Sequence, residues 1–248
     1  TDAQGRYWLP SDKRNGSVFI TIPSGYEAEA DGVFPRFWAA LEAPRGEVEQ
    51  HDFHLTKVDN DRHVMLAVTD IHLSNQFSDI EQFCTRFIPS VNKLAEGLGD
   101  VRVYSLNMGD STWDGYWYTN LYTLDDFHRT MNIVGYPGQM FCAMGNHDND
   151  GATVHSDTVD FEASSAYRRV MGPRYYSFNI GKVHYIMLDN IVYVNTPKED
   201  RSDKIAGKRD YIRRVDAEQR DWLRRDLALV KDKTAPVVVA MHAATYRY

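Results

Sequence analysis

The stretch Val64-Met65-Leu66-Ala67-Val68-Thr69-Asp70-Ile71-His72 is the clearest indication of the fold, because an apolar β-type run leads directly into two side chains that can bind metal. Alternate residues of an extended segment project to the same side, so Asp70 and His72 can reach one ion. Their position just after a strand predicts a ligand site at the carboxyl edge of a sheet.

The same order, an apolar strand followed by a ligand-type residue, recurs three times further along the chain. The strands and the residues after them are Val101–Met108 with Gly109-Asp110, Gln139–Met144 with Gly145-Asn146-His147-Asp148, and Pro236–Met241 with His242. Ligand sites of open α/β sheets lie beyond the carboxyl ends of the strands. We therefore expect all of these groups on one sheet edge.

A helical pattern lies between the first two of these strands. Apolar residues recur at helical spacing from Ser78 to Gly99, and Ser78 with Glu81 has the spacing of a capping box. Pro89 lies inside this segment, and we expect it to kink the helix or divide it in two.

Two more local patterns complete the outline of the fold. A second helix is predicted from Asp216 to Val230, and Gly181-Lys182 is expected to turn a hairpin between Tyr175–Ile180 and Val183–Leu188. Strands that alternate with helices indicate an α/β domain with a largely parallel sheet.

The first 60 residues differ from the rest of the chain. Short β-type runs such as Val18–Ile22 and Phe53–Val58 are separated by turn-forming residues, and no helical period is evident. We predict a small all-β segment over residues 1–60, followed by the α/β domain over residues 61–248.

Composition excludes some classes of function. The net charge of −7 argues against a general nucleic-acid coat, since such proteins usually present a basic face. No apolar run approaches the roughly 18 residues of a membrane span, and no signal segment is evident at the N-terminus. The two cysteines, Cys84 and Cys142, have neither a disulfide framework nor a metal-thiolate spacing, and we expect buried thiols.

The chemistry of the strand-end residues indicates which ions they bind. Carboxylate, amide and imidazole ligands together suit Zn, Fe or Mn better than a site made only of oxygens. Two divalent cations carry +4, and Asp70 with Asp110 returns only −2. Such a centre stays positive and favours an anionic phosphate ester, and a two-metal site stabilises both oxygens of an in-line displacement.

The order D-x-H, G-D, G-N-H-D and a later strand-terminal His resembles the calcineurin-like metallophosphoesterase superfamily over residues 63–248. The resemblance extends to Tyr175-Tyr176-Ser177-Phe178, to Leu188-Asp189 and to Glu218-Gln219-Arg220-Asp221-Trp222-Leu223. It implies a four-layer α/β/β/α sandwich that hydrolyses phosphate mono- or diesters of small molecules.

The same resemblance implies roles for individual residues. Asp70 and His72 would hold one metal, Asp110 would bridge, Asn146 and His242 would hold the second, and a metal-bridging hydroxide would attack phosphorus. His147 would stabilise the transition state and protonate the leaving oxygen. Asp148 would orient His147 by hydrogen bonding, as outer carboxylates commonly do in such sites.

The N-terminal segment has a likeness of its own. Residues 1–10, Thr-Asp-Ala-Gln-Gly-Arg-Tyr-Trp-Leu-Pro, with the following Val18–Tyr26 stretch, resemble the later part of a carboxypeptidase-regulatory-like β-sandwich. A partial sandwich module of this kind often precedes the catalytic domain in exported bacterial metallophosphoesterases. The likeness therefore implies a periplasmic or extracellular setting.

One departure from the family pattern matters for activity. The pattern closes with a G-H-x-H motif that gives one further ligand to each metal, and no such motif occurs before Tyr248. We expect the sequence to be a fragment of a longer protein whose missing ligands lie downstream. Two alternatives remain: a catalytically incomplete module of the same fold that binds phosphorylated ligands, and a structural scaffold that binds no metal.

Three further segments have open interpretations. Asp114 can reach the site from the loop after Asp110, but a solvated turn residue is the favoured interpretation. The aromatic stretch from Trp113 to Tyr122 suits either a substrate wall or ordinary packing. Ile191–Val215 is interpreted as a long loop that can face phosphate, and its basic residues are Lys198, Arg201, Lys204, Lys208, Arg209, Arg213 and Arg214.

Overall fold

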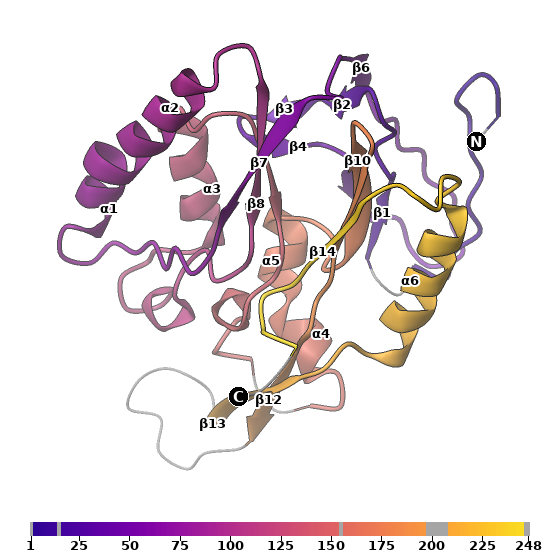
Figure 1. Cartoon of the computed structure of the whole chain (residues 1–248). Helices are drawn as coiled ribbons and strands as arrows, with labels where there is room; N and C mark the ends of the chain where they lie inside the picture. Colours follow the sequence, from indigo (N-terminus) through magenta and orange to yellow (C-terminus); the bar gives the residue numbers. More distant parts are fainter. Residues whose placement is uncertain (1, 14–15, 154–155, 197–207, 246–248) are drawn as a thin grey trace.

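Two three-stranded sheets pack face to face at the centre of the molecule (Figure 1). The computed structural model describes residues 2–13, 16–153, 156–196 and 208–245. Helices α1, α2 and α3 lie outside the first sheet, and α6 lies outside the second (Figure 1). This order of layers confirms the predicted α/β fold class.

The first sheet is parallel and provides most of the strand ends named above. Its strands are β7 (His63–Val68), β8 (Arg102–Asn107) and β9 (Gln139–Cys142), with β8 in the middle. Parallel neighbours require a crossover connection. The crossover from β7 to β8 contains α1 and α2, and the one from β8 to β9 contains α3.

The second sheet contains the predicted hairpin and the last strand. β10 (Tyr176–Ile180) and β11 (Val183–Met187) are antiparallel and turn at Gly181, and β14 (Val237–Ala240) pairs with β11 in parallel. The expectation of a single sheet edge is therefore wrong: His242 follows a strand of the second sheet. Periodicity identifies strands but carries no information about which strands pair.

The first predicted helix is divided, as Pro89 indicated. It consists of α1 (Asp79–Gln82), the π-helical turn η1 (Phe83–Phe87) and α2 (Ile88–Gly97). Pro89 lies in the first turn of α2, directly after the π-helical turn, so the change of hydrogen-bond register falls where its missing N–H interrupts the i→i−4 ladder. The capping-box prediction is wrong, because the Ser78 side chain makes no capping bond and its Oγ accepts from Gln82 Nε2 at 2.7 Å.

The second predicted helix begins where the sequence indicated. Asp216 caps α6 (Ala217–Leu229), since its carboxylate accepts a hydrogen bond from Gln219 N at 2.7 Å. The remaining helical elements are η2 (Asp114–Tyr116), α3 (Leu124–Ile133), η3 (Asn146–Asp148), α4 (Val159–Ala163) and α5 (Ser165–Val170).

The prediction of a long loop over Ile191–Val215 is wrong at both ends of the segment, where the structure has strands. β12 (Ile191–Thr196) and β13 (Lys208–Arg213) form a separate antiparallel pair, which lies between β11 and α6 in the sequence. The β-branched and aromatic run Ile191-Val192-Tyr193-Val194 accounts for the first strand. Three of the basic residues named above lie outside the described residues: Lys198, Arg201 and Lys204.

The N-terminal segment is all-β, as predicted. Its antiparallel pairs are β1 (Ser17–Phe19) with β5 (Trp38–Ala40), β2 (Tyr26–Ala28) with β6 (Leu55–Lys57), and β3 (Ala30–Asp31) with β4 (Phe34–Pro35). The ring of Phe37 lies 4.7 Å from that of Tyr176, and Met140 N donates to Val33 O at 2.8 Å. These contacts join the segment to both sheets.

Apolar side chains fill both faces of the first sheet. Between the two sheets, Phe141 stacks on Phe178 with ring centroids 3.6 Å apart, and Phe178 stacks on Tyr185. On the helical side, Leu124 and Phe127 of α3 are fully buried. A strand end held between two packed faces has little freedom to shift, so the residues that follow it are precisely positioned.

A buried polar network fastens α6 to the second sheet. Ser177 Oγ donates to Asp226 Oδ1 at 2.7 Å, and His184 Nε2 lies 2.8 Å from Asp226 Oδ2. His184 Nδ1 lies 2.8 Å from Asn179 Oδ1, so both ring nitrogens have partners. His184 therefore has the structural role expected of a histidine within a strand.

Replacement of Asp226 tests how much this network stabilises the fold. Asp226→Ala leaves Ser177 and His184 buried without their acceptor, and we expect the free energy of unfolding to fall by about 2–4 kcal/mol. Urea denaturation followed by circular dichroism measures the change. Asp221→Ala, at an exposed position of the same helix, is the matched control and should change stability by less than about 0.5 kcal/mol. Equal losses in the two variants would contradict the role of the network.

Candidate metal centre

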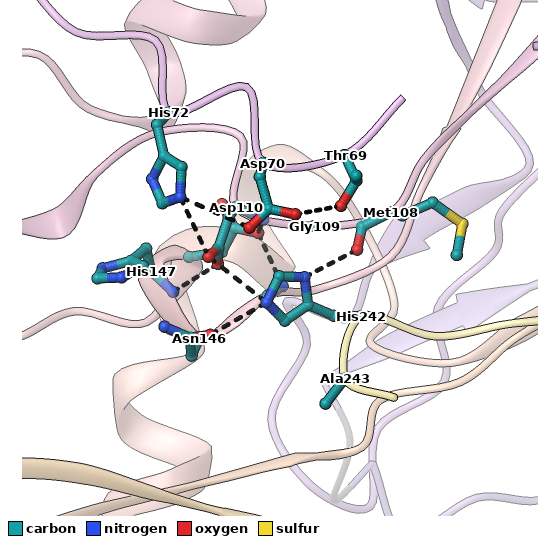
Figure 2. Close-up of polar contacts among 12 residues, drawn as sticks. Thr69, Asp70, His72, Met108, Gly109, Asp110, Asn146, His147, His242 and Ala243 are labelled. Atoms are coloured by element: carbon teal, nitrogen blue, oxygen red, sulfur yellow. Dashed lines mark hydrogen bonds and ion pairs between the residues drawn. The ribbon is translucent and has the colours of Figure 1, made fainter. Parts of the chain in front are cut away.

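Four loops bring the predicted ligands into one cluster (Figure 2). Asp70, Asp110 and Asn146 follow β7, β8 and β9, whereas His242 follows β14 and approaches from the second sheet. His72 Nε2 lies 3.5 Å from Asp110 Oδ2 and 3.7 Å from Asp70 Oδ1, and His242 Nε2 lies 3.4 Å from Asp110 Oδ2. The sequence thus identified residues that the fold brings together.

These separations suit ligands of a shared ion better than direct partners. Two donor atoms about 2.1 Å from one ion, at a tetrahedral angle, lie about 3.4 Å apart. Donor atoms of His72, Asp110 and His147 form one group within 4.8 Å of one another, and those of Asp70, Asp110 and His242 form another. Asp110 belongs to both groups, and its Oδ2 lies within 3.5 Å of both His72 Nε2 and His242 Nε2, so this carboxylate can face two ions.

The orientation of His242 also fits a metal ligand. Its Nδ1 lies 3.0 Å from the backbone carbonyl of Met108, which can only accept, so the proton of a neutral ring is on Nδ1. Its Nε2 lone pair then faces Asn146 Oδ1 at 3.0 Å and the Asp110 carboxylate. A cation between this lone pair and the two oxygens would satisfy all three atoms, and metal-binding histidines commonly donate their other N–H to a carbonyl.

Burial also favours the neutral, metal-binding form of His72. The pKa of His72 is lowered, chiefly because burial removes water from the charged ring. The neighbouring His147 and His242 lower it further, and the charges of Asp110 and Asp70 oppose the shift. The neutral imidazole is the form that binds metal. Among the described residues, His72 Nδ1 has no hydrogen-bond partner.

The backbone at three of these residues is strained. Asp70, His72 and Asp110 have φ values of 52°, 47° and 56°, in the left-handed region that non-glycine residues seldom occupy. The strand-end loops hold this conformation, since Asp70 N donates to Gly109 O at 3.0 Å and His72 N donates to Asp110 O at 2.9 Å. Such strain at a cluster of polar side chains is typical of functional sites.

Two glycines allow the loops to approach so closely. A Cβ at Gly145 would overlap Asp110 Oδ1, and a Cβ at Gly109, which has φ 103°, would lie 2.8 Å from His242 Nδ1. The Gly residues of G-D and G-N-H-D therefore serve the contact between loops as well as the turn itself.

The structure corrects the role of Asp148. This fully buried carboxylate accepts backbone hydrogen bonds from Asp110 N, Ser111 N and Gly145 N at 2.9–3.0 Å, whereas the carboxylate 2.7 Å from the His147 ring is that of Asp114. Asp148 thereby fastens the loop after β8 to the loop after β9. Burial, followed by the charge of Asp110, raises the pKa of Asp148 to about 7, and the three N–H donors oppose the shift.

The carboxylate beside His147 is Asp114. His147 Nδ1 lies 2.7 Å from Asp114 Oδ1, and Asp114 is fully buried, so its interpretation as a solvated turn residue is wrong. The proton of Nδ1 points to the carboxylate, which leaves Nε2 for chemistry. The signal for Asp114 was its position four residues after Asp110 in an aromatic stretch, where a solvated acid is out of place.

The aromatic stretch after Asp110 serves both of the predicted purposes, a wall of the site and ordinary packing. Trp113 is 42% exposed, and its ring lies 5.1 Å from that of His72 and 5.2 Å from that of His147, so it forms a wall of the site. Trp117 is buried, and its indole N–H donates to Thr112 Oγ1 at 2.8 Å.

Comparison with known proteins assigns the chain to a family. Residues 63–248 match the family model for calcineurin-like phosphoesterase. The chain belongs to the calcineurin-like phosphoesterase family. Residues 1–58 match the model for the N terminal of calcineurin-like phosphoesterase. The resemblance drawn from D-x-H, G-D and G-N-H-D is therefore confirmed.

Similarity to solved structures is distant. A dimetal phosphatase from Danio rerio has 10% sequence identity and a TM-score of 0.44, over 73% of this chain and 70% of that one. A cold-active protein-tyrosine phosphatase of a psychrophilic Shewanella species has 16% identity and a TM-score of 0.23, over 60% of this chain and 52% of that one. A search of curated proteins gave no match.

Proposed function

We propose that this member of the calcineurin-like phosphoesterase family hydrolyses phosphate mono- or diesters of small molecules with two metal ions, Mn, Fe or Zn. The observation that carries the proposal is the Asp110 carboxylate, which belongs to both groups of ligand atoms. A carboxylate in that position can hold two cations about 3.5–4 Å apart, the spacing of two-metal phosphoesterases.

The residues at the site divide the work as follows. Asp70, His72, Asp110, Asn146 and His242 would hold the metals, which would activate water and offset the charge of the phosphoryl group.

His147 is the proton donor in this proposal. Asp114 holds the ring through Nδ1, which leaves Nε2 to deliver a proton to the leaving alcohol oxygen. Asp148 keeps the Asp110 and Asn146 loops in register through its three backbone contacts. Trp113 covers His72 and His147 on one side and limits the access of bulk water.

A binding module that lacks catalysis is the second candidate. It would be favoured if the natural sequence downstream of Tyr248 carried no G-H-x-H motif, because each metal would then lack one ligand. Such a module would bind metal and phosphorylated ligands without turning them over.

Metal loading followed by hydrolysis assays separates the two candidates. The full-length natural protein, stripped with a chelator and reloaded with Mn²⁺, is assayed on p-nitrophenyl phosphate and on bis-p-nitrophenyl phosphate. We expect about two ions per chain and turnover that is lost with the metal and returns with it. Bound metal with phosphate binding but no turnover would favour the binding module, and turnover unaffected by chelation would contradict both.

A periplasmic or extracellular setting is part of the proposal. It is supported only by the likeness of the N-terminal segment to modules of exported enzymes. Among the described residues, no helix is long and apolar enough to cross a bilayer. Fractionation of the native host tests the proposal, and recovery of the protein solely in the cytoplasm would contradict it.

A further inference from the structure

A groove of about 960 Å³ opens directly from the metal centre. Asp70 and His72 line its inner end, and it continues along the loop after β7 to η1 and α2. Its walls carry the aromatic side chains of Phe77, Phe83, Phe87, Trp113 and Tyr116. This space is far larger than a phosphate group alone requires, so it is available to the rest of a substrate.

The π-helical turn η1 shapes the far wall of the groove. Three of its residues, Phe83, Arg86 and Phe87, line the groove, and the rings of Phe83 and Phe87 stack with centroids 5.2 Å apart. Phe83 is also buried in the core beneath the helices, which fixes this wall in place. π-Helical turns are rare and often occur at functional sites.

Phe77 lies among the residues that line the groove, and its side chain does not pack into the core of the protein. Its side chain is fully exposed, and its φ of 46° is unusual for a bulky residue. Two contacts hold the turn that displays it: Asp79 N donates to Gln76 O at 3.0 Å, and Ser74 Oγ donates to Asp79 Oδ2 at 2.6 Å. A strained, exposed aromatic ring beside a metal centre points to contact with a ligand.

Four polar side chains of the groove are already engaged within the protein, whereas those of Gln76 and Arg86, which also line it, have no bonding partner among the described residues. Thr69 bonds to Asp70, Ser74 to Asp79, Gln82 to Ser78, and Ser90 to the carbonyl of Arg86. They offer few free donors or acceptors to a hydroxyl-rich or heterocyclic alcohol. A ligand in this groove gains mainly from apolar contact.

We propose that the substrate is a phosphate ester of an alcohol with an extended apolar chain, the phosphate lying at the metal centre and the chain in this groove. The inference rests on the proposed function, because the metal centre sets where the phosphate lies. Continuity between groove and centre carries the argument, since Asp70 and His72 belong to both.

Binding of alkylphosphonates of increasing length tests the proposal without requiring turnover. Ethyl-, butyl-, hexyl- and octylphosphonate, each below its micelle concentration, are titrated calorimetrically into the Mn²⁺-loaded full-length protein. We expect Kd to fall by about twofold to fourfold for each added methylene group. A Kd that does not change with chain length would overturn the proposal.

Two variants locate the chain on the protein. Phe77→Ser should weaken octylphosphonate binding by about fivefold to tenfold and flatten the dependence on chain length. Leu121→Ser is the matched control, since Leu121 is also an exposed apolar residue with positive φ, at 54°, and does not line the groove. A chain-length dependence that is equally steep in wild type and in Phe77→Ser would overturn the placement.

The same titrations separate the inference from the proposed function. Metal-dependent binding of ethylphosphonate together with a flat chain-length dependence would overturn the apolar substrate and leave the phosphoesterase function standing. Absence of metal-dependent binding for every phosphonate would overturn the function, and the inference would fall with it.

Discussion

Asp110→Asn is expected to lower kcat/KM for phosphate ester hydrolysis by about 10³-fold or more in the full-length protein. The amide has the shape of the carboxylate but lacks its charge and one of its two anionic oxygens. Because Asp110 is the residue common to both groups of ligand atoms, metal analysis should find fewer than the two ions expected of the wild type.

The substitution should leave the fold intact. Asp110 Oδ1 accepts from His147 N at 2.7 Å, and an amide oxygen can keep that bond. Circular dichroism should therefore show wild-type helix and strand content. Asp100→Asn, an exposed position outside the site, is the matched control for the loss of one charge and should retain wild-type activity. A full metal complement and normal rate in Asp110→Asn would contradict the bridging role.

His147→Ala is expected to lower kcat by about 10²- to 10⁴-fold while two metals remain bound. The loss should depend on the leaving group: esters of acidic phenols, which depart without a proton, should lose less than esters of alkyl alcohols. His54→Ala, at an exposed histidine of the N-terminal segment, is the matched control and should leave the rate unchanged.

The partner of His147 has its own test. Asp114→Asn should lower kcat by about 10- to 100-fold, and the double variant with His147→Ala should be no slower than His147→Ala alone. That non-additivity, which a purely structural aspartate would not produce, is measured in a double-mutant cycle. Independent losses that multiply in the double variant would show that Asp114 acts on something other than His147.

Much of the site could be predicted from local sequence, because each ligand-type residue directly follows the strand that positions it. Asp70 and His72, and likewise Asp110, follow apolar strands, and a strand that ends in a ligand-type residue needs no knowledge of the distant chain. The same holds for the helix that Asp216 caps, because a cap acts on the first turn that follows it.

Contacts between distant segments were where sequence reasoning failed. The pairing of β14 with β11 puts His242 on a second sheet, and nothing in the last strand indicates its neighbour. Asp114 and Asp148 are both acids close in sequence to ligand residues, and the choice between them as the partner of His147 depends on loop geometry. The family resemblance assigns that role to Asp148, the acid adjacent to His147 in sequence, and the structure gives it to Asp114.

Local sequence is enough to predict the classes of structure and chemistry: strands alternating with helices, a β-rich N-terminal segment, and donors suited to Mn, Fe or Zn. Hydrophobic period and residue type are properties of a few neighbouring residues, so they can be interpreted without knowledge of the fold. Three features emerge from the folded chain alone: Asp110 lies between two groups of donors, Asp114 holds His147, and an aromatic groove opens from the centre. These features depend on distances of a few ångströms between separate loops, which packing of the two sheets and their helices sets.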